Sequence, residues 1–216
     1  MAQDTHAAHP PYLAHHFVST SQQASAAKMG MWLFLGQEIL FFSGLFLAYS
    51  AYRYLYPQTF LHAHEYLNVP MGAFNTFVLI TSSLTMALAV RAAQLSQKRA
   101  LIVNLILTIA FACVFLVVKY FEYSHKFHAG LLPGKYFTAG GIDGVPHIFF
   151  GLYFVMTGLH GIHVLAGIIV LVWILLRSMK GEFGHRYYTP VENVGLYWHL
   201  VDLIWIFLFP LLYLVK

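Results

Sequence analysis

The sequence predicts an all-α, polytopic membrane protein built as a bundle of five transmembrane helices. Hydrophobic residues make up 59% of its 216 residues and charged residues only 9%, a balance that water-soluble domains of this length do not show. The mean hydropathy of +0.67 agrees with this class. The apolar stretches are long and continuous, whereas the strands of an outer-membrane barrel alternate over roughly ten residues. Helices are therefore expected to cross the bilayer.

Windows of about 20 apolar residues locate the five helices. The expected spans are residues 29–56, 70–93, 100–124, 146–177 and 191–215, within a membrane domain over residues 28–216. Residues 1–27 are rich in His, Ala, Ser and Gln and show neither a signal peptide nor a folded domain. We expect this segment to be a polar, partly disordered cytoplasmic arm.

Basic residues beside the loops indicate the orientation, because Lys and Arg are enriched on the cytoplasmic side of membrane helices. An amino end in the cytoplasm places seven of them inside, namely Lys28, Arg91, Lys98, Arg99, Arg177, Lys180 and Arg186. It places five outside, namely Arg53, Lys119, Lys126, Lys135 and Lys216. We expect the amino end to be cytoplasmic and the carboxyl end outside. Because these residues lie at helix ends and form no single patch, no nucleic-acid partner is expected.

Glu38 lies in the middle of the first span, where a carboxylate costs roughly 3 kcal/mol on insertion scales. It therefore needs a partner, a proton or a function. Two further polar pairs at similar depth are His160 with His163 and His199 with Asp202. Each pair is spaced i, i+3, so its members share one helix face.

Three interpretations of these polar residues stay open. In the first, the residues form hydrogen bonds between helices, with His199 and Asp202 bonded to each other. Alternatively, Glu38, His163 and Arg177 surround a phospholipid head group, since arginine geometry suits phosphate. The third interpretation is a proton relay through Glu38.

Metal binding is not expected. The membrane-depth residues form no closed ligand set, and the single cysteine, Cys113, excludes thiolate metal sites and disulfides. Lys119 and Glu122, near the outer end of the third span, are expected to form a partly solvated ion pair of little energetic weight.

Four segments carry a resemblance to a known family. They are LGQEILFFSG at residues 35–44, FEY at 121–123, TGLHGIHVLAG at 157–167 and YWHLVDLIW at 197–205. In this order they resemble subunit III of haem-copper oxidases, and of cytochrome c oxidase in particular. The resemblance extends from residue 29 to the end of the chain.

The resemblance implies a non-catalytic subunit of a proton-pumping terminal oxidase in aerobic electron transport. In that family the subunit is all-helical, has no redox centre of its own and packs directly against subunit I, which holds haem and copper. The implied roles are to stabilise subunit I, bind phospholipid and support proton uptake. Further implied partners are subunit II and a small subunit IV, and the implied location is the bacterial cytoplasmic membrane. No catalytic residue, cofactor or metal is expected in this chain.

The resemblance also assigns roles to individual residues. The lipid-binding or buried polar residues are Phe34 as an apolar wall, Glu38 as the buried carboxylate, His163 as the second histidine of its pair and Arg177 at the inner end of the same helix. A structural polar network is expected from His160, His199, Asp202 and Glu122.

This chain departs from the long form of the family, which has seven helices. It lacks the first two and looks like the five-helix bacterial form, so one wall of the lipid cleft has to come from elsewhere or is absent. Leu47 and Ala51 stand where the long form often has Trp and His, which argues against a second lipid site. Glu38 favours a cytochrome c oxidase, because the quinol branch often has Asp there.

Other functions are weighed against this one. A quinol oxidase subunit III and an accessory subunit of nitric oxide reductase are the alternatives within the family. A free-standing transporter is disfavoured, because the polar residues are few, pair locally and show no internal repeat.

Overall fold

The structure is a computed structural model that describes residues 13–133, 137 and 145–215. Its elements are α1 (Thr20–Leu55), α2 (Pro57–Ala63), the short 3-10 helix η1 (His64–Tyr66), α3 (Val69–Gln94), α4 (Lys98–His128), α5 (Pro146–Met179) and α6 (Thr189–Tyr213). Of these, α1, α3, α4, α5 and α6 are long and apolar enough to cross a membrane. The prediction of an all-α bundle of five such helices is confirmed.

The amino end differs from the expected helix boundary. α1 begins at Thr20, so its first turns belong to the segment expected to be a polar arm. Ser19 caps this start, because its hydroxyl accepts a hydrogen bond from the backbone N–H of Gln22 at 3.2 Å. The helix is therefore longer than its apolar part. Residues 1–12 of the expected arm lie outside the described residues.

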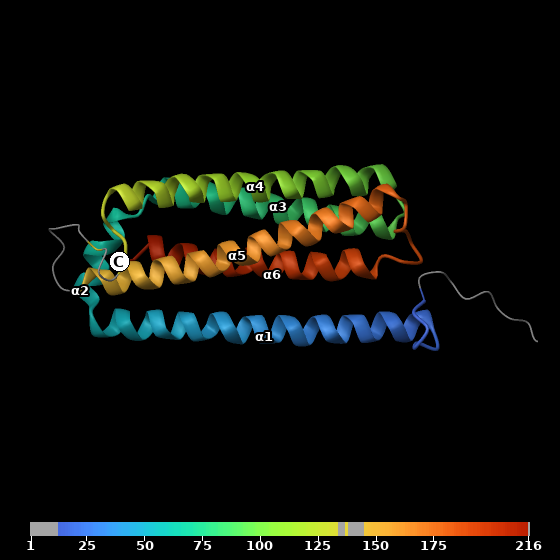
Figure 1. The fold of residues 1–216 in the computed structure, drawn as a ribbon, viewed down its shortest axis with the longest axis horizontal. Helices are drawn as coiled ribbons and strands as arrows, with labels where there is room; N and C mark the ends of the chain where they lie inside the picture. Colours follow the sequence, from blue (N-terminus) through green and yellow to red (C-terminus); the bar gives the residue numbers. More distant parts are fainter. Residues whose placement is uncertain (1–12, 134–136, 138–144, 216) are drawn as a thin grey trace, which may run out of the picture.

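Four of the long helices form a ring, and the fifth lies beside it. α3 contacts α4 and α6, and α5 contacts the same two helices. α1 contacts α2, α5 and α6, and within the described part of the chain it touches neither α3 nor α4. Figure 1 shows α1 as a rod along one edge, with its start and the carboxyl end of α6 at opposite ends of the long axis. An odd number of spans requires this separation.

Tryptophans of α6 fill the centre of the ring. Trp198 and Trp205 are fully buried, and each indole N–H donates to a hydroxyl of α3. The acceptors are Ser82 at 3.0 Å and Thr76 at 3.1 Å. Gly167 of α5 permits the close approach of α6, since a Cβ there would lie 2.6 Å from Cζ3 of Trp198. The large buried indole rings and the small residue opposite them thus hold α6 against α3 and α5.

Candidate functional site

Glu38 of α1 and His163 of α5 meet near the middle of both helices. Nε2 of His163 lies 3.0 Å from Oε2 of Glu38. The side chains are only 12% exposed for Glu38 and 19% exposed for His163, so the contact is largely enclosed by the two helices and their neighbours. The rings of Phe41 and Phe42 lie beside the imidazole. The sequence placed both residues at this depth, and the structure brings them together.

The second ring nitrogen of His163 determines how many protons this contact holds. Nδ1 lies 2.7 Å from the carbonyl oxygen of Leu159, which can only accept, so Nδ1 carries a hydrogen. The Nε2–Oε2 contact then needs one further proton, either on the imidazole or on the carboxyl group. The hydrogen bond between Nε2 and Oε2 therefore depends on one proton between the two side chains.

An apolar groove opens one helical turn away from Glu38. It has a volume of about 280 Å³ and is lined by Met31, Phe34, Ala166, Val170, Val194 and Tyr197. Phe34 lies on its α1 side, 39% exposed, with its ring 5.9 Å from the ring of Tyr197. The Tyr197 hydroxyl donates to the backbone carbonyl of His163 at 2.8 Å. An acyl chain would find apolar walls here, next to the Glu38–His163 pair.

Arg177 is not part of the same cluster. It lies 14 residues beyond His163 on α5, which corresponds to about 21 Å along the helix axis. Its Nε donates to Oε2 of Glu182 at 2.6 Å, and its guanidinium lies over the rings of Trp173 and Phe183. One head group therefore cannot contact Arg177 and Glu38 together. Val170, which lines the groove at Phe34, lies seven residues before Arg177 on α5, about 10 Å along the helix axis, a separation that one acyl chain can span.

The four residues of the expected polar network do not form one network. His160 is fully buried between the rings of Phe115 and Trp205, and neither of its ring nitrogens has a hydrogen-bond partner among the described residues. His199 pairs through Nδ1 with the hydroxyl of Ser83, at 2.7 Å. The expected His199–Asp202 hydrogen bond is absent, because the carboxylate oxygens make no hydrogen bond of normal geometry with any described residue.

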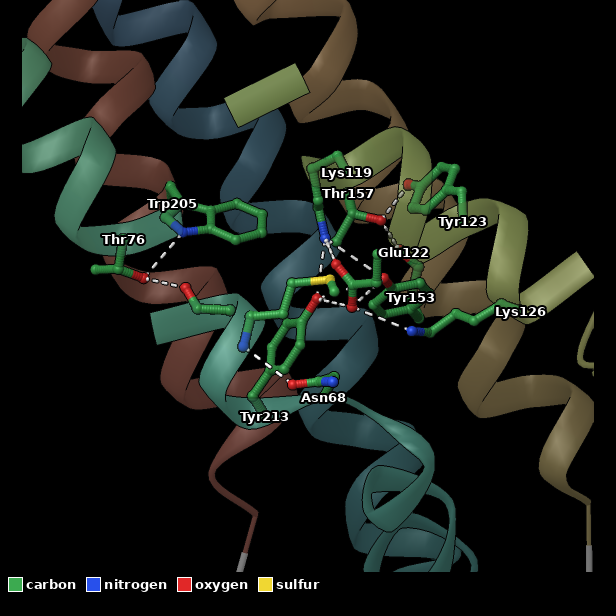
Figure 2. Close-up of polar contacts among 12 residues, drawn as sticks. Asn68, Thr76, Lys119, Glu122, Tyr123, Lys126, Tyr153, Thr157, Trp205 and Tyr213 are labelled. Atoms are coloured by element: carbon green, nitrogen blue, oxygen red, sulfur yellow. Dashed lines mark hydrogen bonds and ion pairs between the residues drawn. The ribbon is translucent and has the colours of Figure 1, made fainter. Parts of the chain in front are cut away.

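Glu122 lies at the centre of a buried ion cluster (Figure 2). The expectation of a partly solvated Lys119–Glu122 pair is wrong: the side chains are 9% and 2% exposed. Glu122 accepts from Lys119 at 2.8 Å, Lys126 at 3.1 Å, Tyr153 at 3.0 Å and Tyr213 at 2.5 Å. These donors come from α4, α5 and α6, so the carboxylate ties three helices together.

The contacts of Glu122 with Lys126 and with the two tyrosines were not predicted. Lys126 follows Glu122 by four residues on one helix face, a spacing that could have indicated the second ion pair. Tyr153 and Tyr213 come from other helices, and nothing in the local pattern marks them. No group of three or more His, Cys, Asp or Glu side chains arranged to hold a metal occurs in the described parts of the chain.

Comparison with known proteins agrees with this arrangement. The family model for cytochrome c oxidase subunit III matches residues 11–216. The chain belongs to the cytochrome c oxidase subunit III family. It is therefore identified as subunit III of a haem-copper oxidase, and the resemblance found in the four sequence segments is confirmed.

Relatives named as subunits of cytochrome c oxidase, quinol oxidase and haem-copper oxidase match the chain. Cytochrome c oxidase subunit 3 of Corynebacterium diphtheriae is 31% identical over 201 residues, 92% of this chain and 93% of that protein. Probable quinol oxidase subunit 3 of Staphylococcus saprophyticus is 25% identical over 197 residues, 90% and 92% of the two chains. Heme-copper oxidase subunit I+III of Aeropyrum pernix is 31% identical over 198 residues, 87% of this chain but 22% of that larger protein.

Proposed function

We propose that this subunit III belongs to a proton-pumping cytochrome c oxidase, packs against subunit I, binds phospholipid and supports proton uptake. The single observation that carries the proposal is the Glu38–His163 contact near the middle of both helices, whose hydrogen bond needs one proton between the two side chains. The apolar groove at Phe34 supplies a place for an acyl chain beside it. In this proposal, electron transfer and oxygen chemistry belong to the partner subunits.

The partner and the location follow from the same proposal. The relative whose name joins subunits I and III in one chain supports direct packing of this chain on subunit I. Subunit II and a small subunit IV complete the complex. The amino end lies in the cytoplasm, the carboxyl end lies outside, and the complex resides in the cytoplasmic membrane of a bacterium.

Purification of the chain from native membranes in mild detergent tests its place in an oxidase. We expect a reduced-minus-oxidised spectrum with a haem a signal, and mass spectrometry that finds subunit I together with a copper-bearing subunit. Haem b and o without that copper would identify a quinol oxidase, the alternative that the Staphylococcus relative favours. A colourless protein without partners would contradict both.

The Glu38→Gln variant tests the role of the proton. Glutamine keeps the shape and a hydrogen-bonding group but cannot exchange a proton with His163. We expect normal assembly and a shortened lifetime of the oxidase during turnover. Ser43→Ala is the matched control on α1, because the Ser43 hydroxyl bonds only to the carbonyl of Ile39 in its own helix. A lifetime equal to that of the wild type would refute the role of Glu38.

A further inference from the structure

A groove between α3 and α6 has an unusual combination of polar floor and apolar rim. It has a volume of about 400 Å³. We call it the α3–α6 groove, and its lining residues are Ile80, Ser83, Leu84, Ala87, His199, Asp202, Leu203 and Ile206. Asp202 lies near the middle of α6 and Ser83 near the middle of α3, so the groove is at mid-membrane depth.

Asp202 lies at the floor of the groove without a full set of donors. The residue is 2% exposed, and neither carboxylate oxygen makes a hydrogen bond of normal geometry with any described residue. Ser83 interacts with the carboxyl group, but its hydroxyl already pairs with Nδ1 of His199 at 2.7 Å. A serine hydroxyl carries one hydrogen, whereas a carboxylate can accept several. This chain therefore leaves most of the accepting capacity of Asp202 unused.

The rim of the groove is apolar and has the spacing of a helix-docking surface. Four aliphatic side chains along it are between 42% and 59% exposed, namely Ile80, Leu84, Leu203 and Ile206. The lining positions on α3 follow the pattern i, i+3, i+4, i+7, and those on α6 follow it as well. This pattern is the stripe that a helix presents to a packed neighbour. Two parallel stripes with a hollow between them form a seat for one more helix.

The nature of the occupant follows from both features together. An acyl chain would cover the aliphatic rim, but it brings no donor to Asp202, and the hydrocarbon core offers no water in its place. A transmembrane helix covers the same rim and can carry a hydroxyl, amide, indole or cationic donor to the carboxylate. Complementarity to an acceptor therefore favours a helix over lipid.

We propose that a transmembrane helix of the haem-bearing subunit I lies in the α3–α6 groove and that one of its side chains donates a hydrogen bond to Asp202. The choice of subunit I rests on the proposed function. The α3–α6 groove shares no lining residue with the groove at Phe34 and includes neither Glu38 nor His163, so lipid at Phe34 and a helix in the α3–α6 groove can be bound together.

Photo-crosslinking in the purified oxidase tests this inference. p-Benzoylphenylalanine is placed at Leu84 or Leu203 in the groove and, as controls, at Val103 or Ile106 of α4, which are exposed but do not line the groove. We expect crosslinks from both groove positions to one transmembrane segment of subunit I, and none from the α4 positions to that segment. Mass spectrometry of the crosslinked peptides identifies the partner.

The other outcomes separate this inference from the proposed function. If subunit I copurifies but the groove positions crosslink only to lipid, to a second copy of this chain or to another subunit, the inference fails and the function stands. Crosslinks to subunit I from α4 alone would also overturn the inference. Absence of subunit I from the purified material would overturn the function, and the inference with it.

Replacement of Asp202 provides a second test with a different readout. Asp202→Leu removes the acceptor, and we expect this chain to dissociate from the detergent-solubilised oxidase about tenfold faster, the factor that corresponds to one hydrogen bond. Asp202→Asn keeps an acceptor and should retain most of the association. The unfolding of the isolated full chain should not become easier in Asp202→Leu. If the isolated chain is destabilised as strongly as the complex, Asp202 serves only this chain's own fold, and the inference is wrong.

Discussion

Glu122 and Glu38 are both carboxylates inside an apolar bundle, but they have different numbers of donors. Glu122 accepts from two lysines and two tyrosines on three helices and is almost completely enclosed. Glu38 has one partner, His163, and lies on α1, which only borders the ring. A carboxylate that fixes a fold is surrounded by donors that hold it charged. Under the proposed function, Glu38 needs fewer donors and a neighbour able to share a proton.

Loss of the Glu122 charge should have the largest effect on the stability of the fold. Glu122→Gln leaves Lys119 and Lys126 buried without a counter-charge, which should lower the free energy of unfolding by about 3–5 kcal/mol. Lys126→Met is the matched control, because it leaves a balanced Lys119–Glu122 pair. We expect it to cost about half as much or less. Unfolding in mixed micelles of mild detergent and dodecyl sulfate, followed by circular dichroism, measures both. Equal losses would mean that packing, rather than charge balance, stabilises this cluster.

Two glycines of α5 near His163 differ in how closely their surroundings are packed. A Cβ at Gly167 would lie 2.6 Å from Trp198, whereas a Cβ at Gly161 would meet nothing within 4 Å. Gly167→Ala should therefore cost about 1–3 kcal/mol of unfolding free energy through overpacking. Gly161→Ala should be neutral or stabilising by up to about 1 kcal/mol, because alanine favours the helix. A similar loss in both variants would show that α5 and α6 are not packed as described.

Removal of the Glu38 carboxylate should have little effect on folding. Glu38→Gln replaces one hydrogen bond by another, so the free energy of unfolding of the isolated chain should change by about 1 kcal/mol or less. The same unfolding measurement as for Glu122→Gln gives a direct comparison. A loss as large as that expected for Glu122→Gln would remove the distinction between a structural and a proton-handling carboxylate.

The smallest effect is expected at the surface ion pair between α1 and α6. Nζ of Lys28 lies 3.0 Å from Oε2 of Glu192, with side chains 44% and 26% exposed. Because exposed pairs contribute little and are screened by salt, Lys28→Met should cost about 0.5 kcal/mol or less, and the cost should vanish at high ionic strength. Unfolding of both chains at low and high salt measures this. A loss that persists at high salt would mean that the Lys28 side chain stabilises α1 by packing.

The sequence predicted the spans well, because each helix has to match the thickness of the bilayer. Helix ends that lie in polar sequence were harder to predict. α1 starts at Thr20, after the capping residue Ser19, and its first turns consist largely of alanine, serine and glutamine. The short helix α2 was not predicted, since Pro57 permits a helix start as readily as a turn. Hydropathy carries no information on such local choices.

For most polar residues, the sequence could not predict which side chain of another helix each one contacts. The depth of Glu38 and of His163 along their helices follows from the sequence, but their meeting depends on how α1 packs on α5. His199 bonds to Ser83 because α6 lies against α3, although Asp202 is closer in sequence. Each partner of this kind comes from tertiary packing, which periodicity within one helix does not encode.

The lateral position of α1 has a consequence for biogenesis. Synthesis proceeds from the amino end, so α1 enters the bilayer before α3 and α4, whereas the long helices that it contacts, α5 and α6, follow them. Until then the ring helices α3 and α4 offer it no contact in the described structure, and Glu38 has no histidine beside it. The length and apolar character of α1 have to retain it in the membrane during this interval, against a cost of roughly 3 kcal/mol for the carboxylate. The arrival of His163 then completes the attachment, which makes the docking of α1 a late step in the assembly of the subunit.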